Sequence, residues 1–507
     1  MGQPRFINPA LSQTNDADRD LVQFVYSSLF KYDGQGNLIP DLVEEYTIEE
    51  DNVTYNITLR KDVLWHDNEL LTANDVIFTI KTIQDPEYKS PLRSIWQGVQ
   101  IEKIDEFTIR FKLNNVYVNF LHNLTIGIMP KHLWAGISAS NFPLAQYNLK
   151  PIGSGPYKFK EFYKNGNGNG YIESMKFIRN ENYYLPEKPF IKEINIYFYN
   201  NQEELIKAYQ KRQIDGLSFL FSTNQPEMRS NINIHNINLP IYYSVFFNQT
   251  ESKALADKNV RLAFSYATDK KEIIEKVLNG KGEQVDSPFL ANWPNFTSET
   301  DKYEFALEHA QNILEENGWK DTDEDGIRQK TINNEDTKLE ISLVASNWPE
   351  LQQTAEMLKE QWEKIGAQVN LEIVDSIDIQ QEYLRPRNYQ ALLFGEVLSA
   401  DPDPFVFWHS TQKKDPGLNI AFYDNKEVDK LLEDARQTIE QEERTEKYAE
   451  FQKLLIKDVP AVFLYSPTYL YPVNNKIKGI EIEKLSQPSF RFSQIENWYI
   501  NTKRVWK

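Results

Sequence analysis

The alternation of hydrophobic and polar residues predicts strands and helices along the whole chain. Thr54 to Leu59 alternates with a period of two, as a half-buried strand does, and Leu351 to Ile365 carries apolar residues at helical spacing. Further strands are predicted at Thr108 to Leu113, Ile191 to Phe198, Tyr242 to Asn248, Val369 to Ile373 and Tyr389 to Phe394, and further helical stretches at Asp18 to Phe30, Gln202 to Arg212, Val260 to Leu278, Tyr303 to Asn317 and Lys426 to Lys457. Because a helix, a glycine and a strand follow one another from Leu351 to Ile373, the pattern predicts an α/β fold.

Length and composition set the class of protein. A chain of 507 residues exceeds one ordinary core, so we expect about two to four packing units. The 40% of hydrophobic and 26% of charged residues indicate a soluble globular chain rather than a disordered one. No run reaches the roughly 20 apolar residues that span a bilayer, and no export signal precedes Arg5. We therefore expect that Met1 and Gly2 stand where a signal has been removed.

Charge and side-chain chemistry exclude several partners. The 56 basic and 74 acidic residues give a net charge of −18, which opposes binding to nucleic acid. The chain has no cysteine, so disulfides, thiol nucleophiles and thiolate metal sites are absent. The 27 Tyr, 29 Phe and 10 Trp are numerous enough to line a recognition cleft in addition to the core.

The most specific stretch runs from Leu59 to Thr79, with the sequence LRKDVLWHDNELLTANDVIFT. Asp67-Asn68 predicts a turn in which Asn68 enters the left-handed region. Thr72 is a good helix N-cap, and Asp75 three residues later completes a capping pattern. A strand, a turn and a helix are therefore expected in this order.

Glycines and prolines mark a second stretch, Pro151 to Phe159, with the sequence PIGSGPYKF. Two glycines and two prolines within six positions predict a tight, stiff connector into a strand. Gly166, Gly168 and Gly170 follow, but their spacing does not complete a nucleotide-binding loop. They are instead expected to form a hairpin turn between Tyr157–Phe162 and Tyr171–Arg179.

Both stretches resemble the family 5 extracellular solute-binding proteins, the peptide-binding receptors of ABC importers. In that family a Trp-His/Ser-Asp-Gly turn precedes a Leu/Val-Thr-Ala-x-Asp-Val helix, and a Pro-Val-Gly-Thr-Gly-Pro-Tyr crossing follows. The run from Val25 to Leu29 is similar to the family's Leu-Tyr-Glu-Gly-Leu, with Ser27-Ser28 in place of Glu-Gly. A backbone contact to a ligand is compatible with this change, whereas a glutamate contact is not.

The resemblance implies a two-lobed, periplasmic-binding-protein-like fold of type II, cluster C. It carries an extra subdomain on the first lobe and two hinge crossovers. Lobe 1 is expected to comprise residues 1–40, 151–249 and 475–507, the inserted subdomain residues 41–150, and lobe 2 residues 250–474. The crossovers are predicted at Asn248 to Glu251 and between Tyr471 and Lys476.

The segment predicted to recognise a ligand is Gly395 to Pro404, with the sequence GEVLSADPDP. Asp401 follows a buried strand, and α/β lobes place ligands at the carboxyl ends of strands. Peptide-binding members of the family use an aspartate in this context for the α-ammonium of the ligand. The alternative for Asp401 is a turn-capping aspartate before a proline.

Other candidates for ligand binding follow from their positions. The backbone groups of Val397, Leu398 and Ser399, and also Asn248, could pair with an extended peptide as an added strand does. Side-chain pockets are predicted to involve Tyr26, Trp293 and Tyr465, and Ser27 is the residue that replaces the family's glutamate. For each of these residues the alternative is packing in a core.

Acidic residues at alternate positions in Asp321, Asp323 and Asp325 suggest a calcium loop. An EF-hand requires a glutamate at loop position twelve, where this chain has Ile332. We therefore predict a solvated turn, with no bound metal and no cofactor.

The chain carries no GxSxG, P-loop or HExxH motif, and its six histidines show no ligand spacing, so we predict that it is not an enzyme. The resemblance implies an extracytoplasmic, monomeric receptor whose precursor is lipid-anchored and whose partners are a peptide ligand and the permease subunits of an importer. The main alternative is the same receptor fold with an oligosaccharide or a nickel- or haem-type ligand. A glycoside or peptide hydrolase is the alternative outside this class.

Overall fold

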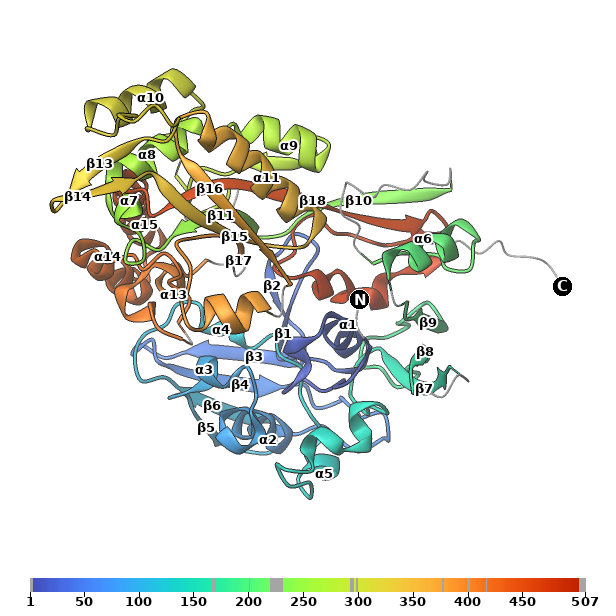
Figure 1. Cartoon of the computed structure of the whole chain (residues 1–507). Helices are drawn as coiled ribbons and strands as arrows, with labels where there is room; N and C mark the ends of the chain where they lie inside the picture. The colour runs from blue at the N-terminus through green and yellow to red at the C-terminus, as the bar shows by residue number, and fades with distance from the viewer. Residues whose placement is uncertain are drawn as a thin grey trace. The chain divides into compact units, whose positions relative to one another are not determined.

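The computed structural model describes residues 3–165, 170–199, 201–218, 231–291, 296–297, 300–375, 378–398, 402–415 and 417–500. These residues form two compact units, whose elements are labelled in Figure 1. Unit 2 is built on Asn238–Tyr469, and unit 1 on residues 3–218, 231–237 and 470–500. None of the helices in the described ranges is long and apolar enough to cross a membrane.

The chain changes unit within β10 (Ile232–Asn238) and again within β18 (Ala461–Asn474). The crossings predicted from sequence lie further along, at Asn248 to Glu251 and between Tyr471 and Lys476. The first crossing differs because β11 (Ile241–Phe247) pairs along its whole length with β17 (Ala391–Val397) of unit 2. Periodicity predicts such a strand but cannot identify the strand with which it pairs.

The first half of unit 1 is built around a four-stranded antiparallel sheet in the order β3-β4-β6-β5. Its core combines side chains between Leu42 and Phe142 with Ala10, Phe30 and Tyr184, and so extends beyond the predicted range of 41–150. The elements are α1 (Asp16–Val25), β1 (Phe30–Tyr32), β2 (Leu38–Pro40), β3 (Val43–Ile48), β4 (Thr54–Leu59), α2 (Ala73–Gln84), α3 (Arg93–Trp96), β5 (Gln100–Lys103), β6 (Thr108–Lys112), α4 (Phe120–Asn123) and α5 (Lys131–Trp134).

The second half of unit 1 contains a three-stranded sheet in the order β7-β8-β9. The predicted hairpin is confirmed, because Phe159 of β7 pairs with Phe177 of β8 in an antiparallel register, while residues 166–169 lie outside the described ranges. The elements are β7 (Tyr157–Lys164), β8 (Ile172–Arg179), β9 (Glu193–Tyr197), α6 (Gln202–Gln210), β19 (Ile477–Lys478) and β20 (Tyr499–Ile500).

Unit 2 is built on a mixed sheet in which β18, β11, β17, β15 (Glu340–Ser346) and β16 (Gln368–Val374) are successive neighbours. β15 runs parallel to both β16 and β17, whereas β11 runs antiparallel to β17 and β18. The short strand β12 (Gly282–Gln284) pairs with β18, and β13 (Gln329–Ile332) forms a separate hairpin with β14 (Glu335–Lys338).

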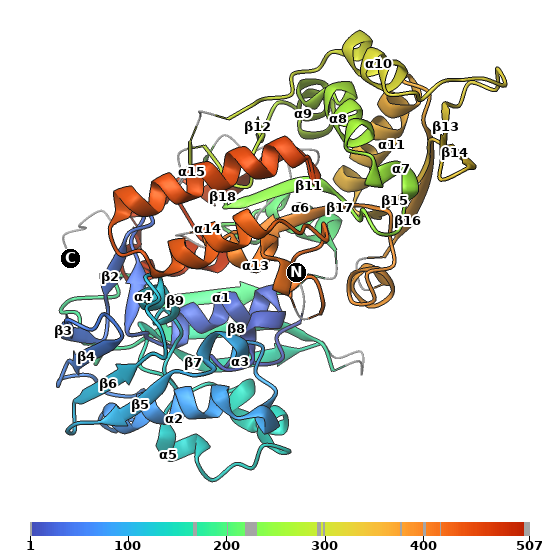
Figure 2. The ribbon, with the colours of Figure 1, turned by 90° about the vertical axis from the view of Figure 1, so that its left-hand side faces the viewer.

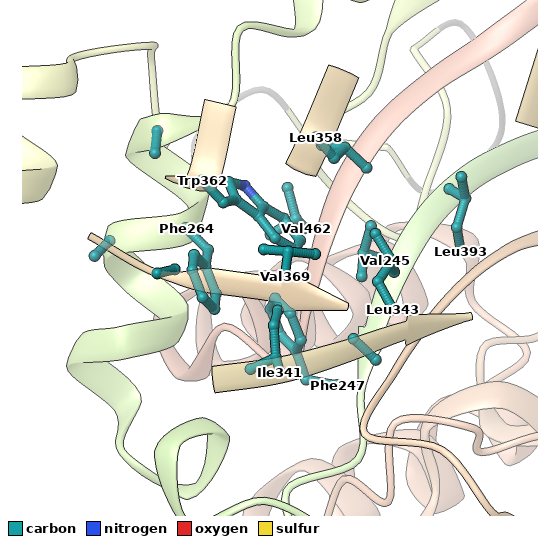
Figure 3. Packing of buried hydrophobic residues seen from close by; sticks show 14 of the residues in the cluster. Val245, Phe247, Phe264, Ile341, Leu343, Leu358, Trp362, Val369, Leu393 and Val462 are labelled. Carbon is teal, nitrogen blue, oxygen red and sulfur yellow. The ribbon is translucent and has the colours of Figure 1, made fainter. Parts of the chain in front are cut away.

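Helices cover both faces of this sheet. Successive residues of a strand point to opposite faces, so each strand contributes side chains to two apolar cores. Val245, Leu343 and Leu393 pack in one core, where Trp362 stacks on Phe264 with ring centroids 4.5 Å apart (Figure 3). This core is covered by α7 (Lys253–Ala256), α8 (Lys258–Ala267), α9 (Lys270–Leu278), α10 (Leu307–Glu316) and α11 (Pro349–Glu363). The other core is covered by α13 (Phe405–Trp408), α14 (Lys426–Gln437) and α15 (Gln441–Asp458), of which α14 and α15 lie side by side in Figure 2.

Two of the predicted helical stretches are longer than the helices that form there. The run from Val260 to Leu278 breaks after α8, where the side chain of Asp269 accepts a hydrogen bond from the N–H of Glu272 at 2.9 Å and caps α9. Similarly, α1 ends at Val25 although the apolar run continues to Phe30, and Tyr26 is already extended. Hydrophobic periodicity therefore located these helices but not their ends.

The strand, turn and helix predicted around Leu59 to Thr79 are confirmed. β4 spans the predicted residues, Asn68 has a φ of 73°, and α2 begins directly after Thr72. The buried carboxylate of Asp75 accepts hydrogen bonds from the N–H of Thr72 and from the N–H of Lys131, both at 2.9 Å. Asp75 therefore caps α2 and also fixes the start of α5.

His66 connects this turn to the glycine-rich connector. The backbone N–H of His66 donates to the carbonyl of Gly153 at 2.8 Å. In the ring, Nδ1 accepts from the N–H of Gly153 at 3.2 Å, and Nε2 lies 3.0 Å from the carbonyl oxygen of Gly155. These partners require a neutral ring with its proton on Nε2. Burial lowers the pKa of His66 to about 3, while the hydrogen bond to Gly155 acts in the opposite direction.

We expect His66 to stay neutral, with its proton on Nε2, as the pH falls from 8 to 4. Its folded pKa of about 3 lies below its unfolded pKa of about 6.5. The neutral ring therefore contributes folding stability that is fully present above pH 6.5 and is lost as the pH falls toward 3. NMR titration of the protein labelled with 13C-histidine checks this, and the resonance of His66 is assigned by its absence in His66→Gln. His309→Gln, at an exposed histidine of α10, is the matched control. A resonance of His66 that titrates near pH 6.5 would contradict the assignment.

Candidate functional site

The carboxyl ends of β15 and β17 lie at the same edge of the unit 2 sheet, because the two strands are parallel. Trp348 follows the end of β15, and Glu396 and Val397 end β17. The register pairs Tyr242 with Glu396 and Tyr243 with Gly395. Because successive residues face opposite sides, this edge presents two different sets of polar and aromatic groups.

Aromatic residues surround a small hollow on the side of Tyr243. The hollow is lined by Tyr243, Leu278, Trp348, Glu350, Leu351, Tyr465 and Pro467. The rings of Tyr243 and Tyr465 lie 5.5 Å apart, and a Cβ atom at Gly395 would lie 2.8 Å from the ring of Tyr243. Glycine at position 395 therefore makes room for this ring.

Tyr465, a predicted pocket residue, does line this hollow, but its side chain is almost fully buried. Its hydroxyl lies 3.0 Å from the hydroxyl of Thr354, which itself donates to the carbonyl of Glu350 at 2.7 Å. Burial raises the pKa of Tyr243 to about 12, and the negative charge of Glu350 acts in the same direction. The tyrosine hydroxyls therefore remain protonated donors at neutral pH.

Glu396 lies on the other side of the edge and is only 4% exposed. Its carboxyl group is hydrogen-bonded to the hydroxyl of Tyr242, and its Oε1 has no hydrogen-bond partner among the described residues. Burial raises the pKa of Glu396 to about 8, although the hydrogen bond from Tyr242 lowers it. The group is therefore largely protonated at neutral pH. Sequence reasoning missed Glu396, and the available signal was an acidic residue inside the apolar run ALLFGEV.

Val397 and Leu398, two of the predicted backbone contacts, lie in the described part of the recognition segment. The side chain of Val397 is 54% exposed, whereas Leu398 is buried and donates its N–H to the carbonyl of Pro240 at 2.6 Å. Val397 therefore presents an apolar surface at the sheet edge, while the N–H of Leu398 is already used within unit 2. Ser399 and Asp401 lie outside the described residues, as does Trp293.

An arginine anchors the chain directly after this segment. The carboxylate of Asp403 accepts hydrogen bonds from Nε and Nη2 of Arg436 at 2.8 and 2.6 Å. The guanidinium of Arg436 lies 3.9 Å from the ring centroid of Phe405, whose N–H donates to Asp403 at 3.2 Å. Two guanidinium N–H groups that meet at one carboxylate oxygen, Oδ2, together with the stacked ring, fix both position and orientation. The second aspartate of the ADPDP sequence therefore holds the segment against α14.

Asn248, predicted as a ligand contact, is fully buried in unit 2. Its side-chain oxygen accepts from the N–H and the hydroxyl of Thr250 at 3.1 and 2.7 Å, and its amide donates to the carbonyl of Arg387 at 3.2 Å. Both polar groups of the side chain therefore stabilise the turn after β11. Its backbone, which was predicted to pair with a peptide, is also used within unit 2, because its N–H donates to the carbonyl of Gln390 at 2.8 Å and its carbonyl accepts from the N–H of Glu251 at 3.3 Å. The proposed ligand contacts therefore do not include Asn248.

Tyr26 and Ser27 also point into the interior, in unit 1. Tyr26 is 5% exposed and its hydroxyl donates to the carbonyl of Ile7 at 3.3 Å, while the hydroxyl of Ser27 donates to the carbonyl of Ser154 at 3.3 Å. Burial raises the pKa of the Tyr26 hydroxyl. This differs from the predicted pocket role, because the chain leaves α1 underneath the glycine-rich connector.

A buried ionic cluster in unit 1 was not predicted. The ammonium of Lys31 lies 3.1 Å from Asp41 and 2.8 Å from Glu496, and the hydroxyl of Tyr184 donates to Asp41 at 2.5 Å. Burial alone would lower the pKa of Lys31, but the two carboxylates raise it well above its usual value. The cluster ties the C-terminal part of unit 1 to β1, and its members are too far apart in sequence to be linked by a motif.

The carboxylates of Asp321, Asp323 and Asp325 lie within 4.8 Å of one another and are exposed. Lys338 of β14 is hydrogen-bonded to Asp325, and its ammonium lies 3.6 Å from Asp323. The hydrogen bond from Lys338 lowers the pKa of Asp325. An ammonium group therefore lies beside the exposed carboxylates of this turn, and the solvated turn stays a prediction.

Comparisons with known proteins identify the family. The family model described as bacterial extracellular solute-binding proteins, family 5 Middle, matches residues 37–417. The oligopeptide-binding protein AppA of Bacillus subtilis (strain 168) is 28% identical, over 99% of this chain and 90% of that protein. A solved structure of AppA from Bacillus subtilis in complex with a nonapeptide has a TM-score of 0.79 and covers 99% of this chain and 97% of its own.

A second solved structure, NikZ from Campylobacter jejuni in complex with Ni(L-His), has a TM-score of 0.81 and 27% identity, and covers 98% of this chain and 97% of its own. These matches agree with the predicted α/β, two-lobed fold class. Because the family model spans most of the sequence, this chain belongs to the bacterial extracellular solute-binding proteins of family 5.

Proposed function

We propose that this protein is an extracytoplasmic receptor that captures peptides and delivers them to the permease of an ABC importer. The observation that carries the proposal is the likeness to AppA over nearly the whole chain, in sequence and in a structure solved with a nonapeptide. The dipeptide-binding protein of Escherichia coli (strain K12), 24% identical over 98% of this chain, supports the same class of ligand.

The carboxyl edge of the unit 2 sheet is the proposed binding surface. Val397 offers an exposed apolar contact, and the residues around the small hollow beside Tyr243 add aromatic groups at the same edge. Asp401 is proposed to bind the α-ammonium of the peptide, since a carboxylate compensates the cost of burying that charge. Asp403, two positions further along the chain, is held by Arg436.

Several parts of this function rest on the family resemblance. They are closure of two hinged lobes over the ligand, a monomeric receptor, and a lipid anchor on the precursor. A binding role in place of catalysis agrees with the family, whose members are named for the solutes that they bind. An oligosaccharide or a nickel- or haem-type ligand is the alternative to a peptide.

Native mass spectrometry of the purified protein tests the class of ligand. We expect a heterogeneous mass above that of the chain, because a receptor that binds the peptide backbone retains peptides of many sequences. Denaturation should release these species, and sequencing by tandem mass spectrometry should identify them as peptides. A released sugar or metal chelate would contradict the proposal.

Asp401→Asn tests the ammonium contact. The parent protein should bind free peptides more tightly than their N-acetylated forms, and the variant should lose most of this preference, by about tenfold in Kd. Isothermal titration calorimetry with both peptide forms measures the ratio. Asp415→Asn, at an exposed carboxylate, is the matched control and should keep the parent's ratio. An unchanged ratio in Asp401→Asn removes Asp401 from the site.

Arg436→Lys tests whether the anchor positions the recognition segment. Lysine keeps the positive charge but loses the paired guanidinium hydrogen bonds to Asp403 and the stacking on Phe405. We expect about a tenfold weaker Kd for free peptides, or roughly 1.4 kcal/mol, with a smaller change for N-acetylated peptides. Calorimetry on the same two peptide forms measures both effects.

Arg385→Lys, at an exposed arginine of the same unit, is the control and should behave like the parent. Equal losses for the free and the N-acetylated peptides would mean that Arg436 contributes general stability and does not position Asp401.

A further inference from the structure

The hydroxyl of Tyr242 connects the two ends of the predicted recognition segment, Gly395 to Pro404. It donates a hydrogen bond to the carboxyl group of Glu396, at the start of the segment. It also accepts a hydrogen bond from the side chain of Trp408, in the short helix α13 that follows the segment. One residue of β11 therefore contacts the chain on both sides of the segment.

Close packing in the core of unit 2 fixes these three side chains, which are all buried. The ring centroid of Phe463 lies 5.5 Å from that of Tyr242 and 6.0 Å from that of Trp408. The register of β11 and β17 places Tyr242 directly opposite Glu396. The core of unit 2 therefore holds both ends of the segment relative to one another.

The burial of Glu396 favours its neutral form. Its Oε1 has no hydrogen-bond partner among the described residues, and a carboxylate with an unpaired oxygen is costly to bury. Burial raises the pKa of Glu396 to about 8, while the hydrogen bond from Tyr242 acts in the opposite direction. No other titratable group in the described part of the chain shifts this pKa. Glu396 therefore ionises as the pH rises through about 8.

We propose that Tyr242 and Glu396 are positioning residues for ligand binding, which hold Val397 and the start of α13 in place while Glu396 is neutral. Val397 is the exposed contact that follows Glu396 at the end of β17. Ionisation of Glu396 draws its unpaired oxygen toward water and disturbs this arrangement, so the affinity for a ligand falls as Glu396 ionises. This role rests on the peptide-receptor function proposed above and adds a pH dependence to it.

Glu396→Gln tests the charge, because glutamine accepts a hydrogen bond from Tyr242 through its amide oxygen but does not ionise. The probe is a pool of peptides built from alanine and serine, from tripeptides to nonapeptides, which carry no ionisable side chain. Equilibrium dialysis with detection by mass spectrometry gives the Kd of the parent and of the variant between pH 6 and pH 9. The α-ammonium of the peptides also titrates near pH 8. The measured quantity is therefore the ratio of the parent's Kd to the variant's Kd at each pH, in which the titration of the peptide cancels.

We expect this ratio to rise about tenfold from pH 6 to pH 9, because one pH unit above the pKa lowers the neutral fraction of Glu396 about tenfold. Glu356→Gln, at an exposed glutamate of α11, is the matched control, and its ratio to the parent should not change with pH.

Tyr242→Phe tests the hydroxyl, because phenylalanine keeps the ring but loses both hydrogen bonds. We expect about a tenfold weaker Kd at pH 7. The loss of affinity on raising the pH should also move to higher pH, because the hydrogen bond from Tyr242 lowers the pKa of Glu396. A residue that only stabilises the core would not move this pH profile. Tyr389→Phe is the control, since it removes another buried hydroxyl of the same core, which donates to the carbonyl of Ile420 at 2.6 Å. It should keep the Kd and the pH profile of the parent.

A ratio of parent to Glu396→Gln that stays constant from pH 6 to pH 9 overturns the positioning role but leaves the peptide function standing. The same loss of affinity in Tyr389→Phe as in Tyr242→Phe assigns the loss to the core in general and also overturns the role. If Tyr242→Phe does not fold, the comparison with Glu396→Gln decides by itself. If the parent binds no peptide of the pool at any pH, the proposed function fails, and the positioning role fails with it.

Discussion

Unit 1 depends on close contact between the backbone at the end of α1 and the backbone of the glycine-rich connector, with no side chain between them. A Cβ atom at Gly153 would lie 2.0 Å from the carbonyl oxygen of Val25, and one at Gly155 would lie 2.6 Å from its carbonyl carbon. Instead, the N–H of Gly155 donates to the carbonyl of Val25 at 2.8 Å. His66, in the turn between β4 and α2, bonds with the same glycines. The end of α1, the turn and the connector therefore meet at one point, and larger residues at the glycines would separate them.

Unit 2 depends in a comparable way on the parallel pairing of β15 with β17. That pairing brings the carboxyl ends of both strands to one edge of the sheet. Trp348 and Val397 therefore lie at the same edge although they are 49 positions apart in the sequence. The antiparallel partner β11 adds Tyr242 and Tyr243 to this edge. Helices cover both faces of the sheet, and the carboxyl ends of the strands are where α/β folds usually bind their ligands.

Three carboxyl groups near this edge have three different environments. Glu396 is buried beside Tyr242 and its pKa is raised, so it behaves as a neutral hydrogen-bonding group. Asp403 is held by the guanidinium of Arg436 and serves as an anchor. Glu350 is buried in the first turn of α11 and lines the same small hollow as Tyr243 and Tyr465. The same functional group therefore contributes to packing or to positioning, according to its neighbours.

The sequence by itself determined the local structure and the family. β4, the left-handed Asn68 and the start of α2 follow from alternation, turn chemistry and capping, all of which act over a few residues. Only the tertiary structure decided which groups meet. The bond between His66 and Gly155 spans 89 positions, and the bond between Tyr242 and Glu396 spans 154. Asn248 and Tyr26 were predicted to face a ligand but are buried, because burial depends on which strand or connector packs over a residue. Such contacts are set by strand register and by close packing, and neither leaves a periodic signal in the chain.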